Sequence, residues 1–94
     1  MQKLKIITVC GFGIGSSLIL KMTVDTVLSK HGIDADVEPH DITSVTDDGV
    51  DLLLTSSSLY KEIKDKVHCK IVTIENFISE EEVAEKILPV INAA

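Results

Sequence analysis

The sequence predicts an α/β protein, a three-layer α/β/α sandwich on a four-stranded parallel sheet. Short apolar segments rich in Val and Ile alternate along the chain with segments whose apolar residues recur at helical spacing. Strands that alternate with helices form parallel sheets through right-handed crossovers, and strands that are apolar throughout are expected where both faces are covered. Because 94 residues suffice for one modest core, we expect a single domain over residues 1–94.

The first unit is a strand, a glycine-rich loop and a helix. Leu4 to Val9 is a β-branched apolar run that ends in glycines, and helical spacing starts at Ser16. This helix should end at His31-Gly32, where glycine supplies the left-handed residue of a C-cap. The residues expected on its buried face are Leu20, Val24, Val27 and Leu28.

Three further strands and two helices complete the predicted sheet. The strands are expected at Ile33 to Glu38, Val50 to Thr55 and Lys70 to Ile74. A polar stretch with turn residues, HDITSVTDDG, follows Pro39 and separates the second strand from the third. The second helix begins at Ser56, Ser57 and Ser58, and its expected core residues are Leu59, Ile63 and Val67.

The last helix has a start signal and a break. Ser79 and Glu82 have the spacing of a capping box. The helix that follows should bury Val83, Ala84, Ile87 and Leu88, and Pro89 should kink it or end its regular hydrogen bonding.

The expected strand order is 2-1-3-4, the flavodoxin-like arrangement of a doubly wound sheet. It places strands one and three side by side, and ligands bind in such folds where the strand order reverses, beyond the carboxyl ends of the strands. Cys10 ends the first strand at that point. Ser56 and Ser57 end the third, so they form a second loop that should lie beside the cysteine.

The loop sequence VCGFGIGSSLIL suits a small anion. Backbone N–H groups of a glycine-rich turn and of the first turn of a helix converge and carry partial positive charge. The same field favours the thiolate of Cys10 and makes it a better nucleophile than a free cysteine. The pattern therefore predicts a pocket for a phosphoryl group carried on sulfur, with the hydroxyls of Ser16 and Ser17 as further donors or caps.

Other glycine-loop functions fit less well, although a plain tight turn stays open as an alternative. A dinucleotide fingerprint needs G-x-G-x-x-G, and counting from Gly11 the last position is Ser16. A mononucleotide P-loop needs GKS or GKT after the glycines, and neither occurs. A cysteine phosphatase needs an arginine in the loop, and none lies between Cys10 and Lys21. The loop is thus suited to accept a phosphoryl group and poorly equipped to hydrolyse it.

Charge and composition limit the partners. The net charge is −6, which disfavours nucleic acids and anionic membrane surfaces because no basic run offsets it. The longest apolar stretch is shorter than the ~18 residues that cross a bilayer, and the start of the chain shows no cleavage site. We expect a cytoplasmic protein with reduced cysteines, no nucleic acid partner and no direct membrane insertion.

The stretch CGFGIGSSLILKMTVD resembles the enzyme IIB components of the bacterial phosphoenolpyruvate-dependent sugar phosphotransferase system (PTS). It is closest to the ascorbate-type branch, whose loop has the form C-G-x-G-x-G-S-S before an apolar helix that contains Lys and Met. The lactose and cellobiose branch more often has C-S-x-G-M-S-T-S, and the galactitol branch lacks the alternating glycines. The resemblance extends over the whole chain in length and in element order, with its specific part in this stretch.

The resemblance implies a protein-phosphohistidine–sugar phosphotransferase. Cys10 would take a phosphoryl group from a histidine of the IIA component and pass it to a sugar, L-ascorbate, bound by the membrane IIC component, so the chain would associate peripherally with that transporter. Two alternatives stay open: a regulatory IIB-like module that senses phosphorylation, and a relative of the low-molecular-weight cysteine phosphatases. The phosphate loop implied by the match consists of Gly11, Phe12, Gly13, Ile14, Gly15, Ser16 and Ser17.

The other candidate residues are expected to be structural. Cys69 enters the fourth strand far from the loop and should be a half-buried packing residue. His40 and His68 lack metal-ligand spacing, so we expect surface positions for both, and no metal or cofactor. Phe12 and Ile14 could dock on a partner at the loop tip, or Ile14 could fold onto the core.

Overall fold

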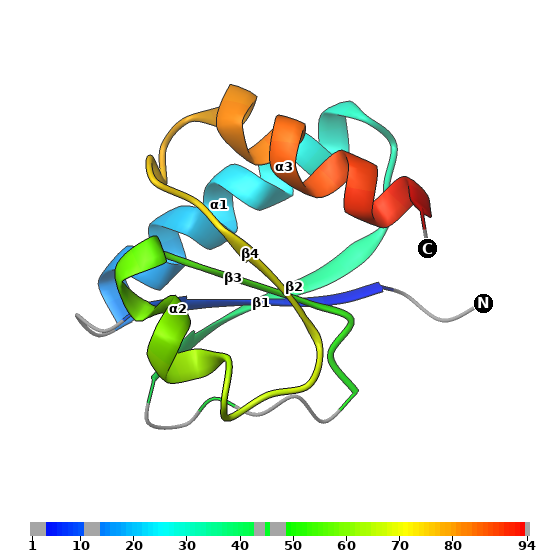
Figure 1. The fold of residues 1–94 in the computed structure, drawn as a ribbon. Helices are drawn as coiled ribbons and strands as arrows, with labels where there is room; N and C mark the ends of the chain where they lie inside the picture. Colours follow the sequence, from blue (N-terminus) through cyan, green and yellow to red (C-terminus); the bar gives the residue numbers. More distant parts are fainter. Residues whose placement is uncertain (1–3, 11–13, 43–44, 46–48, 94) are drawn as a thin grey trace.

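A four-stranded parallel sheet organises the protein (Figure 1). The computed structural model describes residues 4–10, 14–42, 45 and 49–93. The strands are β1 (Leu4–Cys10), β2 (Ala35–Asp41), β3 (Leu52–Thr55) and β4 (Lys70–Thr73). Their order in the sheet is β2-β1-β3-β4 and all neighbours are parallel, which confirms the predicted topology.

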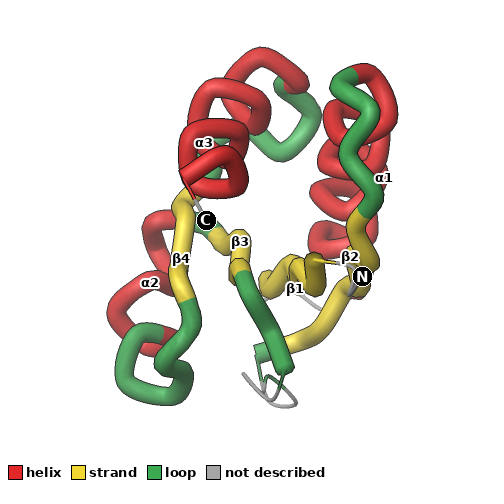
Figure 2. The backbone as a smooth tube through the Cα atoms, turned by 90° about the vertical axis from the view of Figure 1, so that its right-hand side faces the viewer, coloured by secondary structure: helices red, strands yellow, loops and turns green. Residues whose placement is uncertain are grey.

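Helices cover the sheet from both sides. They are α1 (Ile14–Lys30), α2 (Ser57–Ile63) and α3 (Glu80–Ala93). The two longer helices, α1 and α3, lie together on one face, and α2 lies on the other (Figures 1 and 2). The predicted α/β/α sandwich is confirmed.

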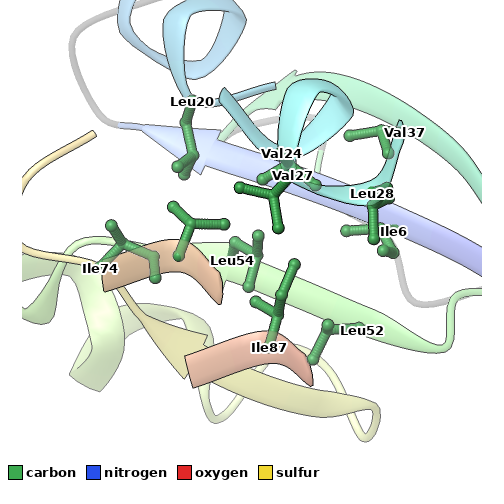
Figure 3. Close-up of a cluster of buried hydrophobic side chains, with 11 residues drawn as sticks. Ile6, Leu20, Val24, Val27, Leu28, Val37, Leu52, Leu54, Ile74 and Ile87 are labelled. Atoms are coloured by element: carbon green, nitrogen blue, oxygen red, sulfur yellow. The ribbon is translucent and has the colours of Figure 1, made fainter. Parts of the chain in front are cut away.

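The larger part of the core lies between the sheet and the pair α1 and α3 (Figure 3). The apolar face predicted for the first helix is buried there in full. Alternate residues of β1 and β3 meet this face, as the period of two in a strand requires. The buried members of this cluster are Ile6, Leu20, Val24, Val27, Leu28, Val37, Leu52, Leu54, Ile74, Val83 and Ile87.

The opposite face carries a smaller cluster under α2. Its buried members are Ile7, Val9, Leu53, Ile63 and Val67. The connection between β2 and β3 helps to cover them, because Ile42, Val45 and Val50 pack against the cluster. Helix α2 ends at Ile63, so Val67 reaches the core from beyond the helix and not from its face as predicted.

Strand β2 corrects two expectations. It starts at Ala35, two residues later than predicted, and it continues through Pro39 to Asp41. It lies at the edge of the sheet, where a residue without an N–H is tolerated. It is also not apolar throughout: Val37 is buried towards α1, whereas Asp36 and Glu38 on the opposite side are exposed. Helices therefore cover both faces of the inner strands but only one face of β2.

Helix α1 begins earlier than predicted and ends as predicted. Its first residue is Ile14, not Ser16. At its end the Ile33 N–H donates to the Leu28 carbonyl at 2.9 Å and Gly32 has a φ of 67°. This is the Schellman C-cap, in which the left-handed residue is glycine because a side chain there would be strained.

Helix α3 uses only half of the predicted capping box. The Glu82 N–H donates to Ser79 Oγ at 3.2 Å, but the Glu82 carboxylate turns to the preceding loop. There it accepts from the N–H groups of Glu75 and Asn76 at 2.7 and 2.8 Å, and from Lys86 Nζ at 2.7 Å. Pro89 lies inside α3, which continues to Ala93, so the expectation that the helix could end there is wrong.

These contacts generate a stability prediction. The Glu75 N–H and the Lys86 ammonium lower the pKa of Glu82 from 4.5 to about 2. A carboxyl whose pKa is lowered on folding stabilises the protein above its unfolded pKa, and this stabilisation is lost as the pH falls from about 4.5 towards 2. Glu82→Gln should lower the free energy of unfolding at pH 7 by ~1–3 kcal/mol. Urea unfolding at several pH values should show the gap to the wild type closing below pH 4.

The matched control is Glu81→Gln, which removes an exposed carboxylate from the same helical turn. It should change stability by less than ~0.5 kcal/mol. A gap for Glu82→Gln that is equally large at pH 7 and pH 3 would contradict the assignment of the stabilisation to the ionised carboxylate.

Candidate functional site

The candidate site lies where the strand order reverses, between the carboxyl ends of β1 and β3. From β1 the chain passes through α1 to β2 on one side, and from β2 it crosses to β3 on the other side of β1. Diverging connections of this kind leave a crevice at the strand ends, which is where doubly wound folds bind ligands. Cys10 is the last residue of β1 and therefore reaches this edge, as predicted.

The backbone at the end of β1 is held on both sides. On one side the register pairs Cys10 with Asp41 at the end of β2. On the other side the Thr55 hydroxyl donates to the carbonyl of Val9 at 2.9 Å. Both Val9 and Thr55 are fully buried. The candidate cysteine is thus attached to a buried part of the sheet.

The predicted phosphate loop divides into two segments. Gly11, Phe12 and Gly13 lie outside the described residues. Ile14 and Gly15 were expected before the helix, but together with Ser16 and Ser17 their backbone forms the first turn of α1. The step from β1 to α1 is therefore short, and four of the seven predicted residues would act through helical N–H groups.

Electrostatics at the start of α1 favour an anion. The first N–H groups of a helix have no partner within the helix, and they carry the positive end of its dipole. The first turn of α1 contains no acidic residue that would neutralise this charge. Lys30 occupies the last turn, where a cation is favourable.

The predicted second loop lies at the same edge of the sheet. Ser56 directly follows β3 as the N-cap of α2, and Ser57 is the first residue of that helix. The Ser56 side chain does not cap the helix; its hydroxyl lies 2.9 Å from that of Ser58. Because β3 is the neighbour of β1, the fold brings these serines towards the end of β1. Whether they contact a ligand stays a prediction.

The second cysteine lies at the other end of the sheet. Cys69 is half-buried just before β4 and packs against the smaller core cluster, as predicted. It lines an open pocket of about 460 Å³ together with Tyr60, Lys64, His68 and Lys70. Because all strands are parallel, the start of β4 and the end of β1 lie at opposite edges.

The histidines have surface positions. His68 is exposed. His40 is half-exposed in β2, with Nε2 3.7 Å from the Glu38 carboxylate. Within the described part of the chain, no three His, Cys, Asp or Glu side chains are grouped so that they could hold a metal ion.

The sequence matches a known family over most of its length. Residues 5–88 match the family model described as "PTS system, Lactose/Cellobiose specific IIB subunit". The chain belongs to this family. The family and the fold predicted from the stretch that starts at Cys10 are both confirmed.

Individual PTS proteins agree with this assignment. The ascorbate-specific EIIB component of Shigella boydii is 33% identical over 91 residues, which cover 95% of this chain and 90% of that protein. The corresponding component of Mycoplasma pneumoniae is 28% identical over 92 residues, or 96% and 97% of the two chains. The lactose-specific IIB domain of Streptococcus pneumoniae superposes with a TM-score of 0.71 at 18% identity over 97% of both chains, which supports the fold. None of the helices described for this IIB chain is long and apolar enough to span a membrane.

Sequence reasoning missed one functional candidate, Thr55. It was assigned only as the end of a strand. The one signal was a hydroxyl residue that closes the apolar run LLLT. That signal indicates a role at the site only once β3 is known to pair with β1, because the pairing brings the Thr55 hydroxyl to Val9.

The site generates a prediction for the thiol of Cys10. The helix terminus should lower its pKa below the free value of about 8.5. Iodoacetamide alkylation followed against pH, in a Cys69→Ser background, should give a midpoint below that value. The urea-unfolded chain serves as the reference, and a native midpoint at or above the unfolded one would rule out a thiolate stabilised by α1.

Proposed function

We propose that this IIB chain is the phosphocarrier of an ascorbate phosphotransferase system. In this proposal Cys10 accepts a phosphoryl group from a phosphohistidine of the IIA component and passes it to L-ascorbate bound by the membrane IIC component. The observation that carries it is the position of Cys10 at the end of β1, just before the start of α1, in a chain of the PTS IIB family. The ascorbate-specific relatives support the choice of sugar.

Two in-line transfers make up the proposed reaction. In the first, the Cys10 thiolate attacks phosphorus, the S–P bond forms, and the N–P bond breaks so that the electron pair returns to the donor histidine. In the second, a sugar hydroxyl attacks, the O–P bond forms and the hydroxyl proton passes to solvent, while the S–P bond breaks and its electron pair returns to sulfur as the thiolate. Helical N–H groups of α1 would stabilise the charge on the equatorial oxygens in both steps.

The outer face of α1 supports a protein partner. Leu18, Ile19 and Met22 are large apolar residues that are 42%, 46% and 60% exposed. They lie in the helix turns that follow the candidate site, on neighbouring positions of one helix face. Ile78, which is 72% exposed, lies near α1 as well. The residue before it, Phe77, is held to α1 because the Thr23 hydroxyl donates to the Phe77 carbonyl at 2.6 Å.

We assign this apolar face to the IIA donor. The phosphohistidine of IIA must come within bonding distance of the Cys10 sulfur, so the interface with IIA has to include the surface beside the candidate site. In this proposal the chain lies in the cytoplasm, peripherally at the transporter, where it would meet IIA and IIC in turn.

The first test identifies the phosphorylated residue. The chain is incubated with the PTS phosphorelay proteins, a IIA component and labelled phosphoenolpyruvate, and the label is mapped by mass spectrometry. Cys10→Ser should abolish the label, whereas Cys69→Ser should leave it largely intact because Cys69 lies at the opposite edge of the sheet. Label that survives in Cys10→Ser and disappears in Cys69→Ser would overturn the assignment.

The same experiment separates the alternatives. Addition of IIC membranes and ascorbate should move the label from the protein to the sugar. A regulatory module would keep its label under these conditions. A phosphatase relative would release inorganic phosphate and hydrolyse aryl phosphates without any partner.

A second test addresses the docking face. Met22→Glu places a charge in the exposed apolar surface and should slow phosphoryl transfer from IIA by about tenfold, the effect of ~1.4 kcal/mol at an interface. Alkylation of Cys10 should stay unchanged. The control is Ser29→Glu, which adds the same charge at an exposed position near the other end of α1. Equal slowing by both variants would point to net charge instead of docking.

A further inference from the structure

The hydrogen bond from Thr55 to Val9 lies at a particular point of the sheet. The described pairing of β1 with β3 ends at Thr8 and Leu54. On its other side β1 stays paired with β2 as far as Cys10. The described pairing of the two inner strands thus ends just before the cysteine, at the crevice where the strand order reverses.

Thr55 connects three strands at this point. Its main chain remains with β4, because it pairs with Thr73 and its carbonyl accepts from the Ile74 N–H at 2.7 Å. Its side chain turns to β1, where Oγ1 donates to the Val9 carbonyl at 2.9 Å. Thr55 and Val9 are both 0% exposed, so water does not replace this bond in the folded protein.

Peptide geometry passes this constraint on to Cys10. The carbonyl of Val9 and the N–H of Cys10 belong to one planar peptide unit. A hydrogen bond that fixes the direction of the Val9 carbonyl therefore also fixes the orientation of this peptide plane, in which the Cα atom of Cys10 lies. Without the hydroxyl, this buried carbonyl would lose a donor, and the orientation of the peptide unit that leads to Cys10 would be less tightly fixed.

We infer that Thr55 is a positioning residue, which holds Cys10 against the start of α1 through the peptide that joins Val9 to Cys10. This inference rests on the proposed role of Cys10 as the phosphoryl carrier. Thr55 does not touch the reacting atoms in this scheme. It sets the place of the nucleophile, and a nucleophile displaced by ~1 Å can lose up to about 100-fold in rate.

The test compares three threonine variants in a Cys69→Ser background. Thr55→Val keeps the side-chain shape and removes the hydroxyl, whereas Thr55→Ser keeps the hydroxyl. Thr23→Val is the matched control, because Thr23 is also a buried threonine that donates to a carbonyl, that of Phe77, and neither residue belongs to β1 or β3. Each variant is measured by thermal melting, by the pH dependence of iodoacetamide alkylation of Cys10 and by phosphoryl acceptance from the IIA component.

Thr55→Val should raise the alkylation midpoint of Cys10 by about one pH unit and lower phosphoryl acceptance about tenfold. Thr55→Ser should restore both values. Thr23→Val should melt earlier without moving the midpoint. An unchanged midpoint in folded Thr55→Val, or an equal shift in Thr23→Val, would overturn the inference.

A measurement on the unsubstituted chain keeps the test decisive if Thr55→Val does not fold. The hydroxyl proton of Thr55 should be visible by NMR and exchange slowly with water, and rapid exchange would contradict the hydrogen bond. Failure of the proposed function is seen separately. Label on Cys10 from phosphoenolpyruvate tests the carrier role, whereas alkylation tests the position of the thiol without any partner protein.

Discussion

The structure depends on the enclosure of β1. This strand is paired with β2 on one side and β3 on the other, and its residues from Ile6 to Val9 are 0% exposed. Ile6 belongs to the core under α1 and α3, whereas Ile7 and Val9 belong to the core under α2. A shift of β1 by one residue would exchange these two faces, so its register is strongly specified. The end of this fixed strand is Cys10, and the candidate site inherits its position from the core.

The strand order could be predicted because the inner strands are recognisable in the sequence by their apolar residues. β3 is buried on both faces and is apolar up to Thr55, and β1 is buried from Ile6 to Val9 and is apolar there apart from Thr8. The edge strand β2 has one exposed face, and its sequence ADVEPHD mixes charges with a proline. Local sequence patterns therefore predicted the first and last residues of β2 incorrectly. Pairing with β1 over seven positions, not β-propensity, defines this strand.

The candidate site could be proposed from the sequence where it depends on residue type, but not where it depends on the pairing of strands. A cysteine before alternating glycines indicates anion chemistry by itself. The start of α1 was misplaced because serines are favoured N-caps and glycine is a poor helix former, yet α1 begins at Ile14 and includes Gly15. Thr55 could not be found in this way. Its partner Val9 is 46 residues away, and only the pairing of the strands brings the two together.

The chemistry of the cationic side chains bears on the proposed relay. The chain contains no arginine, so all nine of its basic residues are lysines. Lys21, the lysine that follows the loop in sequence, is paired with Asp25, and Lys5 is paired with Glu38. A guanidinium fork fixed on the phosphoryl group would stabilise the phosphorylated protein and raise the barrier to the second transfer. A carrier has to lose the group as readily as it gains it. In the proposed relay, neutral N–H donors and a nucleophile positioned from the buried sheet would meet that requirement better than a fixed cation.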